Sequence, residues 1–475
     1  MYQRQHEWAV FFLIYADLQN TKFNNLDINE FKKPFASESE ELKRLFNDIL
    51  TSPVSSRSDI YIIYNEVNKF PGLKDATYLF KVINGRKGKS LKKIIKIDSS
   101  DFIQKPKGII NLLKKVDIAK YRKKMVITWD HGSIFGVFKK EVRPHDLGYE
   151  KVSVKTKSIY LKRNPPYITA SVSKLKNRVP VIIPPCKKIP SPTVKIRDIL
   201  TNEELADIIK KGIGKADILI MYNCGMMNLN TAFALHVKKS VDFFIAPQGG
   251  IDPPSYNFKE ILKNVCTDPL ISPFQLSRVC INTLNKLRLQ RDTAYMEAIS
   301  SWSIICLNLN YLQNVITLIN KLSKKLIAII REGSSTPERR NTVQALRDIR
   351  ESLFPFDATT QSSMYMVDLR ALLHKLSISE MFSSQFTGMY ESLEKNIQRL
   401  LVDKFVGHKL YTSIRGKPYS DNIEPSGLSL FFPRNEADLV LEIFNTFIAE
   451  NAKLRSVFFS KTMWPGFICR FMKSK

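Results

Sequence analysis

The sequence predicts an α/β fold with a mostly parallel sheet, followed by a mainly α-helical C-terminal region. Up to residue 270, short apolar runs rich in strand-forming residues alternate with segments whose apolar residues recur at helical spacing. From residue 271 to residue 475, leucine and isoleucine recur mainly at helical spacing, and one strand at 427–433 returns to the core. Because 475 residues exceed one ordinary domain, we expect an α/β domain at 1–270 and a second region at 271–475.

The first element is the apolar run 8–16, W-A-V-F-F-L-I-Y-A. It follows a short polar segment that contains Arg4, as the apolar part of a signal peptide would. Its strand-forming residues and the turn residues from Asp17 onward favour a central strand instead. No other run reaches the roughly 18 apolar residues that a membrane span needs. We therefore expect no membrane span and a cytoplasmic protein as numbered, or a secreted one if a signal peptide preceded residue 1.

The other elements are predicted from periodicity and helix-start signals. Segment 37–50 has acidic residues early and apolar residues at helical spacing, and Thr201 with the glutamates that follow it is a good helix start. Expected strands lie at 58–66, 77–82 (short and near an edge), 125–130, 218–222 and 241–246. Expected helices lie at 37–50, 111–121, 201–211, 231–239, 274–289, 294–330, 344–353, 365–376 and 389–405.

A long segment at 139–197 separates two of these strands. It is rich in lysine and contains three proline clusters. Prolines at that density prevent helices and central strands, so we expect an extended surface excursion. Loops of this length are either functional or mobile insertions.

The chain is strongly basic, with a net charge of +28. Such an excess favours acidic partners, nucleic acid among them. The basic stretches do not interleave aromatic residues with arginines, as a platform that stacks bases would. Nucleic-acid binding is therefore kept as an alternative below other functions.

Two reactive residue types directly follow predicted strands. Cys224 comes after the run 218–222 and precedes a glycine, and His131 comes after the run 125–130 and also precedes a glycine. If the two strands are parallel neighbours, their carboxyl ends bring both residues within reach of one another. The six cysteines are scattered without a C-x-x-C pair, so neither a zinc site nor a disulfide framework is indicated.

These residues resemble the clostripain family, cysteine peptidases of the caspase and gingipain type. The specific matches are W-D-H-G-S at 129–133 and the strand-Cys-x-Met pattern at 218–226. Weaker similarities follow in the expected order at 8–17, 246–256, 367–369 and 427–433. The resemblance implies a caspase-like three-layer α/β/α sandwich and a hydrolase that cleaves a protein or peptide substrate.

The resemblance also implies how the site works. His131 and Cys224 would form the catalytic dyad, and the backbone N–H groups of Gly132 and Cys224 would form the oxyanion hole. Cys224 would attack the scissile carbonyl to give a thioester acyl-enzyme, and His131 would protonate the departing amine and then assist water. This chemistry requires no metal or other cofactor. Family members can depend on calcium, although the sequence contains no calcium loop of recognised spacing.

One position departs from the clostripain pattern. Family members carry an aspartate two residues before the cysteine, where it helps to accept arginine or lysine, whereas this chain has Tyr222. A tyrosine cannot form the charge-assisted pair that a carboxylate forms with a guanidinium. We expect Tyr222, Asn223 and Asp252 in the specificity pocket, the loop 246–256 as one wall, and Asp252 or Glu260 as the substitute carboxylate.

Family members are often activated by cleavage between the histidine and cysteine strands, as zymogens. The excursion 139–197 suits that role because it carries exposed basic sites such as Lys155 and Lys162, and it equally suits a shielding insertion. The leading hypothesis is a cysteine endopeptidase, a thiol protease. The alternatives are an inactive caspase-like binding or regulatory module and a basic nucleic-acid-binding protein. The sequence leaves the oligomeric state open.

Overall fold

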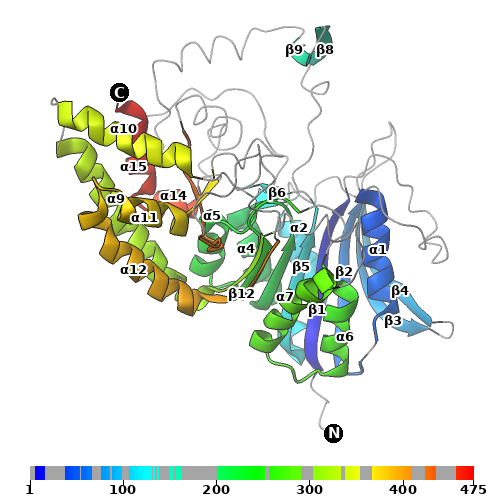
Figure 1. Cartoon of the computed structure of the whole chain (residues 1–475). Coiled ribbons are helices and arrows are strands. Elements are labelled where there is room, and N and C mark those ends of the chain that lie inside the picture. Colours follow the sequence, from blue (N-terminus) through cyan, green and yellow to red (C-terminus); the bar gives the residue numbers. More distant parts are fainter. Residues whose placement is uncertain are drawn as a thin grey trace.

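The fold is built on a nine-stranded sheet in the order β15-β13-β12-β11-β5-β1-β2-β3-β4 (Figure 1). The computed structural model describes residues 6–16, 38–53, 55–66, 76–85, 88–98, 106–130, 132–133, 136–137, 149–154, 157–162, 200–251, 256–289, 303–332, 337–353, 366–407, 423–434 and 456–474. The strands of this sheet are β1 (His6–Ala16), β2 (Ser58–Glu66), β3 (Ala76–Gly85), β4 (Gly88–Asp98), β5 (Tyr121–Trp129), β11 (Ala216–Tyr222), β12 (Val241–Pro247), β13 (Ser303–Asn308) and β15 (Leu401–Val406).

The centre of the sheet is parallel and its margins are antiparallel. Strands β12, β11, β5, β1 and β2 pair in parallel. Strands β3 and β4 extend one margin and β13 and β15 extend the other, all by antiparallel pairing. The first strand lies inside the sheet between β5 and β2, as its buried apolar run predicted.

Helices cover both faces of the sheet. Along β1, Val10 and Phe12 belong to one buried cluster and Phe11 and Leu13 to the other, because successive side chains of a strand point to opposite faces. The first cluster includes residues of α1 (Glu38–Thr51), α6 (Phe258–Thr267) and α7 (Pro273–Leu289). The second includes residues of α2 (Pro106–Leu113), α4 (Asn202–Ile213) and α5 (Leu229–Val237). The predicted three-layer α/β/α class is confirmed.

The C-terminal region enlarges the second cluster. Its helices gather on one side of the sheet, at the left of Figure 1. They are α9 (Leu312–Glu332), α10 (Pro337–Ser352), α11 (Leu369–Ile378), α12 (Ser383–Leu400), α14 (Val457–Lys461) and α15 (Trp464–Lys473), preceded by the short η3 (Leu309–Tyr311). The apolar run at 427–433 contains β16 (Ser429–Phe431), which pairs with β14 (Met366–Asp368) in a separate two-stranded sheet.

Several element predictions in this region were wrong in type. The segments predicted as helices at 294–330 and 389–405 contain the strands β13 and β15, and the segment 365–376 begins with β14. In β13 the run S-I-I-C-L is buried throughout, so its pattern carries no alternation that separates a strand from a helix. In β15 a helix of good periodicity, α12, directly precedes the strand and hides its start.

Two predictions in the first half also differ from the structure. The helix expected at 111–121 ends at Leu113, and a short helical turn, η2 (Ile118–Lys120), leads into β5 at Tyr121. Strand β4 was not predicted, because its closely spaced lysines obscure the period of two. It is the edge strand of the sheet, where lysines discourage pairing with other chains.

The segment between β5 and β11 is described only in part. Short strands β6 (Gly132–Ser133), β7 (Gly136–Val137) and β10 (Leu200–Thr201) form a small three-stranded sheet, and β8 (Tyr149–Val154) pairs with β9 (Lys157–Lys162). Most of the excursion 139–197 lies outside the described residues. Thr201 then starts α4 through a capping box with Glu204, as predicted.

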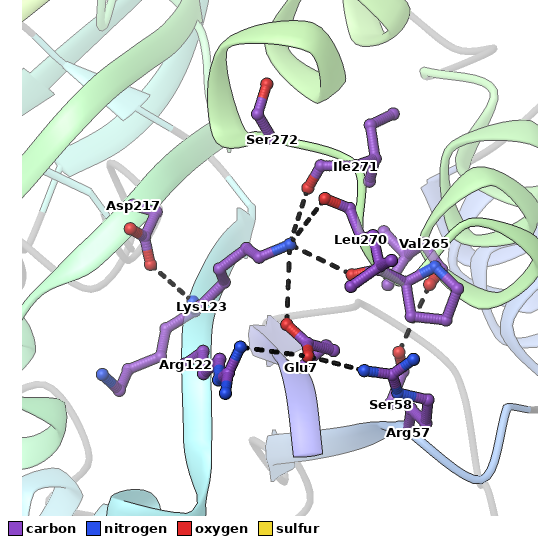
Figure 2. A network of polar contacts seen from close by, with 12 residues as sticks. Glu7, Arg57, Ser58, Arg122, Lys123, Asp217, Val265, Leu270, Ile271 and Ser272 are labelled. Carbon is purple, nitrogen blue, oxygen red and sulfur yellow. Dashed lines mark hydrogen bonds and ion pairs between the residues drawn. The ribbon is translucent and has the colours of Figure 1, made fainter. Parts of the chain in front are cut away.

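An ion network around the buried Glu7 holds the end of the sheet where β1 and β5 begin (Figure 2). Lys123 donates to the carbonyl oxygens of Pro269, Leu270 and Ile271 at 2.8–3.1 Å, and its Nζ lies 3.8 Å from Glu7. Burial lowers the pKa of Lys123, and Arg57 bonds the same Glu7 at 2.7 Å. This network fixes the turn between α6 and α7. It lies at the end of the sheet opposite the carboxyl ends of β5 and β11. Among the described helices, none combines the length and apolar character of a membrane span.

Candidate active site

The exits of β5 and β11 lie side by side. The two strands pair in parallel, and Tyr222 stands opposite Trp129 in the register. Cys224 follows two residues beyond Tyr222, and Asp130 follows directly after Trp129. The prediction that the strands before Cys224 and His131 are parallel neighbours is confirmed. His131 itself lies outside the described residues.

A tight turn after β11 presents Cys224. Gly225 has φ of +66°, a conformation that glycine adopts without strain, and its N–H donates to the Gly249 oxygen at 2.8 Å. The Met227 N–H donates to the Pro247 oxygen at 2.8 Å. Asn228 then caps α5 by accepting the Thr231 N–H at 2.9 Å. The turn is thus bonded to the loop that follows β12.

The Cys224 thiol is the half-buried one among the described cysteines. Its Sγ accepts the Ile251 N–H at 3.4 Å and lies 3.7 Å from the Ile251 oxygen. Cys280 and Cys306 are fully buried, and burial raises the pKa of both thiols. Since the thiolate is the reactive form and needs access to its target, Cys224 has the setting of a reactive cysteine and the other two that of core residues.

Gly132 brings the strand exit after β5 against the cysteine turn. A Cβ at this position would lie 2.5 Å from the Cys224 backbone oxygen and 2.9 Å from the Asn223 Cβ. Real Cβ atoms do not approach a backbone atom this closely, so the close approach requires glycine. The residue predicted for the oxyanion hole therefore contacts the backbone of Asn223 and Cys224.

Asn223 holds the backbone after β5. It is fully buried, it accepts a hydrogen bond from Thr128, and its Nδ2 donates to the Asp130 oxygen at 2.7 Å. Asp130 has φ of 151°, which residues other than glycine rarely adopt. The side chain predicted to line the specificity pocket thus bonds to the strained residue next to the histidine position.

Tyr222 packs among aromatic rings. Its ring stacks on Trp129 at 6.2 Å and meets the edge of Tyr256 at 6.3 Å, and it is 7% exposed. The position therefore supplies an apolar ring with a small exposed fraction. Asp252 lies outside the described residues. Glu260 lies in the first turn of α6, where its N–H donates to the Asn257 side chain at 3.1 Å.

Sequence analysis gave no role to two buried residues that the structure brings next to this site. Gln248, in the loop after β12, donates from Nε2 to the Asp368 carboxylate at 2.8 Å. The two residues are 120 positions apart in the chain, so no local pattern could reveal the pair. The available signals were the positions of Gln248 within the similarity at 246–256 and of Asp368 within that at 367–369.

The remaining described histidines have structural settings. His236 bonds the Leu309 oxygen at 2.8 Å and stacks on Phe233. His374 packs on Tyr390, and His6 packs on Tyr121 at the start of β1. Within the described ranges, no group of three or more His, Cys, Asp and Glu residues could hold a metal ion.

Replacing Gly132 with alanine is expected to lower the free energy of unfolding by about 1–3 kcal/mol, because the new Cβ overlaps backbone that is already packed. Thermal or denaturant unfolding measures the change. Gly108→Ala is the matched control, since nothing lies within 4 Å of a Cβ there and the residue is in α2, where alanine is favoured. A Gly132→Ala protein as stable as the control would contradict the close approach.

Solved structures that are similar to the whole fold are C11 proteases. A secreted C11 cysteine protease from Bacteroides thetaiotaomicron, "iotapain", superposes with a TM-score of 0.54 at 13% identity, covering 90% of this chain and 94% of the other. An inactive zymogen C11 protease from Parabacteroides distasonis gives 0.54 at 12% identity, covering 94% and 97%. This chain has the C11 protease fold.

A secreted C11 cysteine protease from Bacteroides thetaiotaomicron in complex with an irreversible peptide inhibitor has a TM-score of 0.50 at 11% identity, covering 98% of this chain and 99% of the other. No protein-family model matches the sequence, and no curated protein matches it either. The resemblance to clostripain-type peptidases is thus confirmed by a C11 fold that extends over nearly the whole chain.

Proposed function

We propose that this chain is a cysteine endopeptidase with Cys224 as nucleophile and His131 as its acid and base. One observation carries the proposal: the half-buried thiol stands at a parallel strand exit of a C11 fold, next to the exit that precedes His131. Neighbouring carboxyl ends of parallel strands are where open α/β folds place reacting groups. The similar structures are those of cysteine proteases, one of them in complex with a peptide inhibitor.

The reaction has two halves. His131 takes the thiol proton, the Cys224 sulfur attacks the scissile carbonyl carbon, and the carbonyl oxygen becomes an oxyanion that the N–H groups of Gly132 and Cys224 receive. The C–N bond then breaks, His131 gives the proton to the leaving amine, and a thioester remains. Water attacks the thioester as His131 takes its proton, and the acid product and the free thiol are released. No metal or organic cofactor enters these steps.

We propose that this site does not prefer arginine or lysine, because of the residue at position 222. Tyr222 has its ring between Trp129 and Tyr256 and offers no carboxylate there. Without a fixed negative charge, a guanidinium gains no charge-assisted pair at this position. The position instead favours an apolar or aromatic substrate side chain.

Activation by cleavage in the excursion 139–197 is part of the proposal. The excursion lies between β7 and β10 of the small sheet, and Thr201 in β10 is the N-cap of α4. A cut in the excursion therefore leaves β5 and β11 intact. One structure with this fold is that of an inactive zymogen.

The test uses the wild-type chain before and after limited proteolysis. Incubation with a broad peptide library is expected to give hydrolysis products, and a thiol-directed peptidyl inhibitor is expected to modify Cys224, which peptide mapping by mass spectrometry identifies. Absence of products and of labelling in both samples would overturn the proposal and favour an inactive binding module. Products only after proteolysis would support activation by cleavage.

A further inference from the structure

Two buried polar residues join the C-terminal region to the loop that bonds the Cys224 turn. Gln248 and Asp368 are each 1% exposed. Gln248 lies directly after β12, and Asp368 ends β14 and caps α11 by accepting the Arg370 N–H at 2.8 Å and the Ala371 N–H at 3.2 Å. The pair therefore connects two segments that are remote in sequence.

The Asp368 carboxylate is filled with donors. Its other oxygen, Oδ2, accepts the Gln248 Nε2, the Ser426 N–H and the Ser426 hydroxyl at 2.8–2.9 Å. Burial raises the pKa of Asp368, while these hydrogen bonds lower it in part. A buried carboxylate with this many donors has one arrangement, so it fixes the direction of the Gln248 amide.

Gln248 is anchored on both sides. Its backbone N–H donates to the Ser303 oxygen at 2.7 Å, and its side-chain Oε1 is 3.5 Å from the Ser303 hydroxyl. Its side chain therefore lies between the start of β13 and Asp368. Because main chain and side chain are both held, the position of residue 248 is fixed relative to the sheet and to β14.

The residues around Gln248 make the contacts of the cysteine turn. The oxygens of Pro247 and Gly249 accept the N–H groups of Met227 and Gly225. Three residues beyond Gln248, the Ile251 N–H donates to the Cys224 sulfur at 3.4 Å. A shift of Gln248 thus moves the backbone dipole that faces the sulfur.

We propose that Gln248 and Asp368 are positioning residues for Cys224. Asp368 fixes the Gln248 amide, Gln248 fixes the loop 247–251, and the loop places the Ile251 N–H on the sulfur and the Gly249 and Pro247 oxygens on the turn. The catalytic meaning of this arrangement rests on the proposed function. The placement of the sulfur does not, because it follows from the contacts alone.

The test measures alkylation of the native chain by iodoacetamide, cysteine by cysteine, with mass spectrometry across pH. Gln248→Met keeps the size of the side chain and removes both polar ends. It is expected to slow alkylation of Cys224 about three- to tenfold at neutral pH and to move the pH midpoint of its profile upward, since a hydrogen bond to a thiolate favours that form. Cys280 and Cys306, both fully buried, report any unfolding in the same sample.

A second variant gives a response that a loss of stability would not. Gln248→Glu places a second carboxyl group against the buried Asp368 carboxylate. The two groups share one proton until the pH is well above the usual carboxyl range. At low pH the shared proton replaces the lost N–H donor. The Cys224 alkylation rate of the variant, divided by that of the wild type, is then expected to be near one. The ratio is expected to fall as pH rises and the pair loses its proton.

Ser426→Ala is the matched control, because it removes the Ser426 hydroxyl, which donates to Asp368 and accepts the Leu428 N–H, but leaves the Gln248 bond and the Ser426 N–H bond to Asp368 in place. It is expected to leave the Cys224 rate unchanged within about twofold. Wild-type Cys224 rates in both Gln248 variants, with Cys280 unlabelled, would overturn the positioning role. Altered rates in a chain that hydrolyses no peptide would support that role and reject only the proposed peptidase.

Discussion

Alanine at position 224 is expected to reduce kcat/KM for peptide hydrolysis by about 10⁴-fold or more, to the background of the assay. The variant lacks the sulfur that forms the acyl-enzyme, and no other described thiol stands at the strand exits. The fold should persist, since the side chain is half-buried and its hydrogen bonds with the Ile251 backbone are long, at 3.4 and 3.7 Å. Steady-state hydrolysis of a peptide found in the library screen measures the loss.

A cysteine outside the site provides the control for that measurement. Cys266 lies in α6 and is buried, and Cys266→Ala is expected to retain activity within about twofold while it loses a small amount of stability. Turnover in the Cys224→Ala protein at the wild-type rate would refute the assignment of the nucleophile. Equal losses in both variants would point to unfolding as the cause.

The second large effect is on stability. Asp368→Ala is expected to lower the free energy of unfolding by about 3–5 kcal/mol, because it leaves buried donors from Gln248, Ser426, Arg370 and Ala371 without their acceptor. Urea unfolding followed by circular dichroism measures it. Asp207→Ala is the contrast, since its surface pairs with Lys211 and Lys238 contribute about 0–1 kcal/mol.

A result within about 1 kcal/mol of wild type for Asp368→Ala would mean that water or a rearranged side chain satisfies these donors. That outcome would contradict the rigid cluster on which the positioning role depends. The free energy of unfolding of the Asp368→Asn protein should lie between those of the wild type and of Asp368→Ala. Its amide oxygen can still accept at the start of α11, but its NH₂ group faces the Gln248 and Ser426 donors.

The sequence was sufficient for the part of the site that local patterns encode. The runs before Cys224 and His131 are short, apolar and followed by glycine, and strands with that pattern are buried and parallel. The observed register, with Tyr222 opposite Trp129, confirms that reading. The start of α4 at Thr201 was likewise encoded by residues within one helical turn.

The sequence did not predict the buried strand β13, the lysine-rich edge strand β4 or contacts between distant residues. A strand buried on both faces, such as β13, carries no alternation, and the exposed edge strand β4 carries lysines where alternation would be expected. The Gln248 and Asp368 pair depends on the packing of β14 beside the loop after β12. Predictions for His131, Asp252 and most of the excursion 139–197 concern residues outside the described ranges and stay predictions.

The order of the strands has a consequence for biosynthesis. A ribosome makes the Cys224 strand well before it makes β13 and β14, which supply Ser303 and Asp368 as the two anchors of Gln248. A nascent chain that ends at α7 therefore contains Cys224, Gln248 and the loop 247–251 but lacks the Ser303 and Asp368 anchors of Gln248.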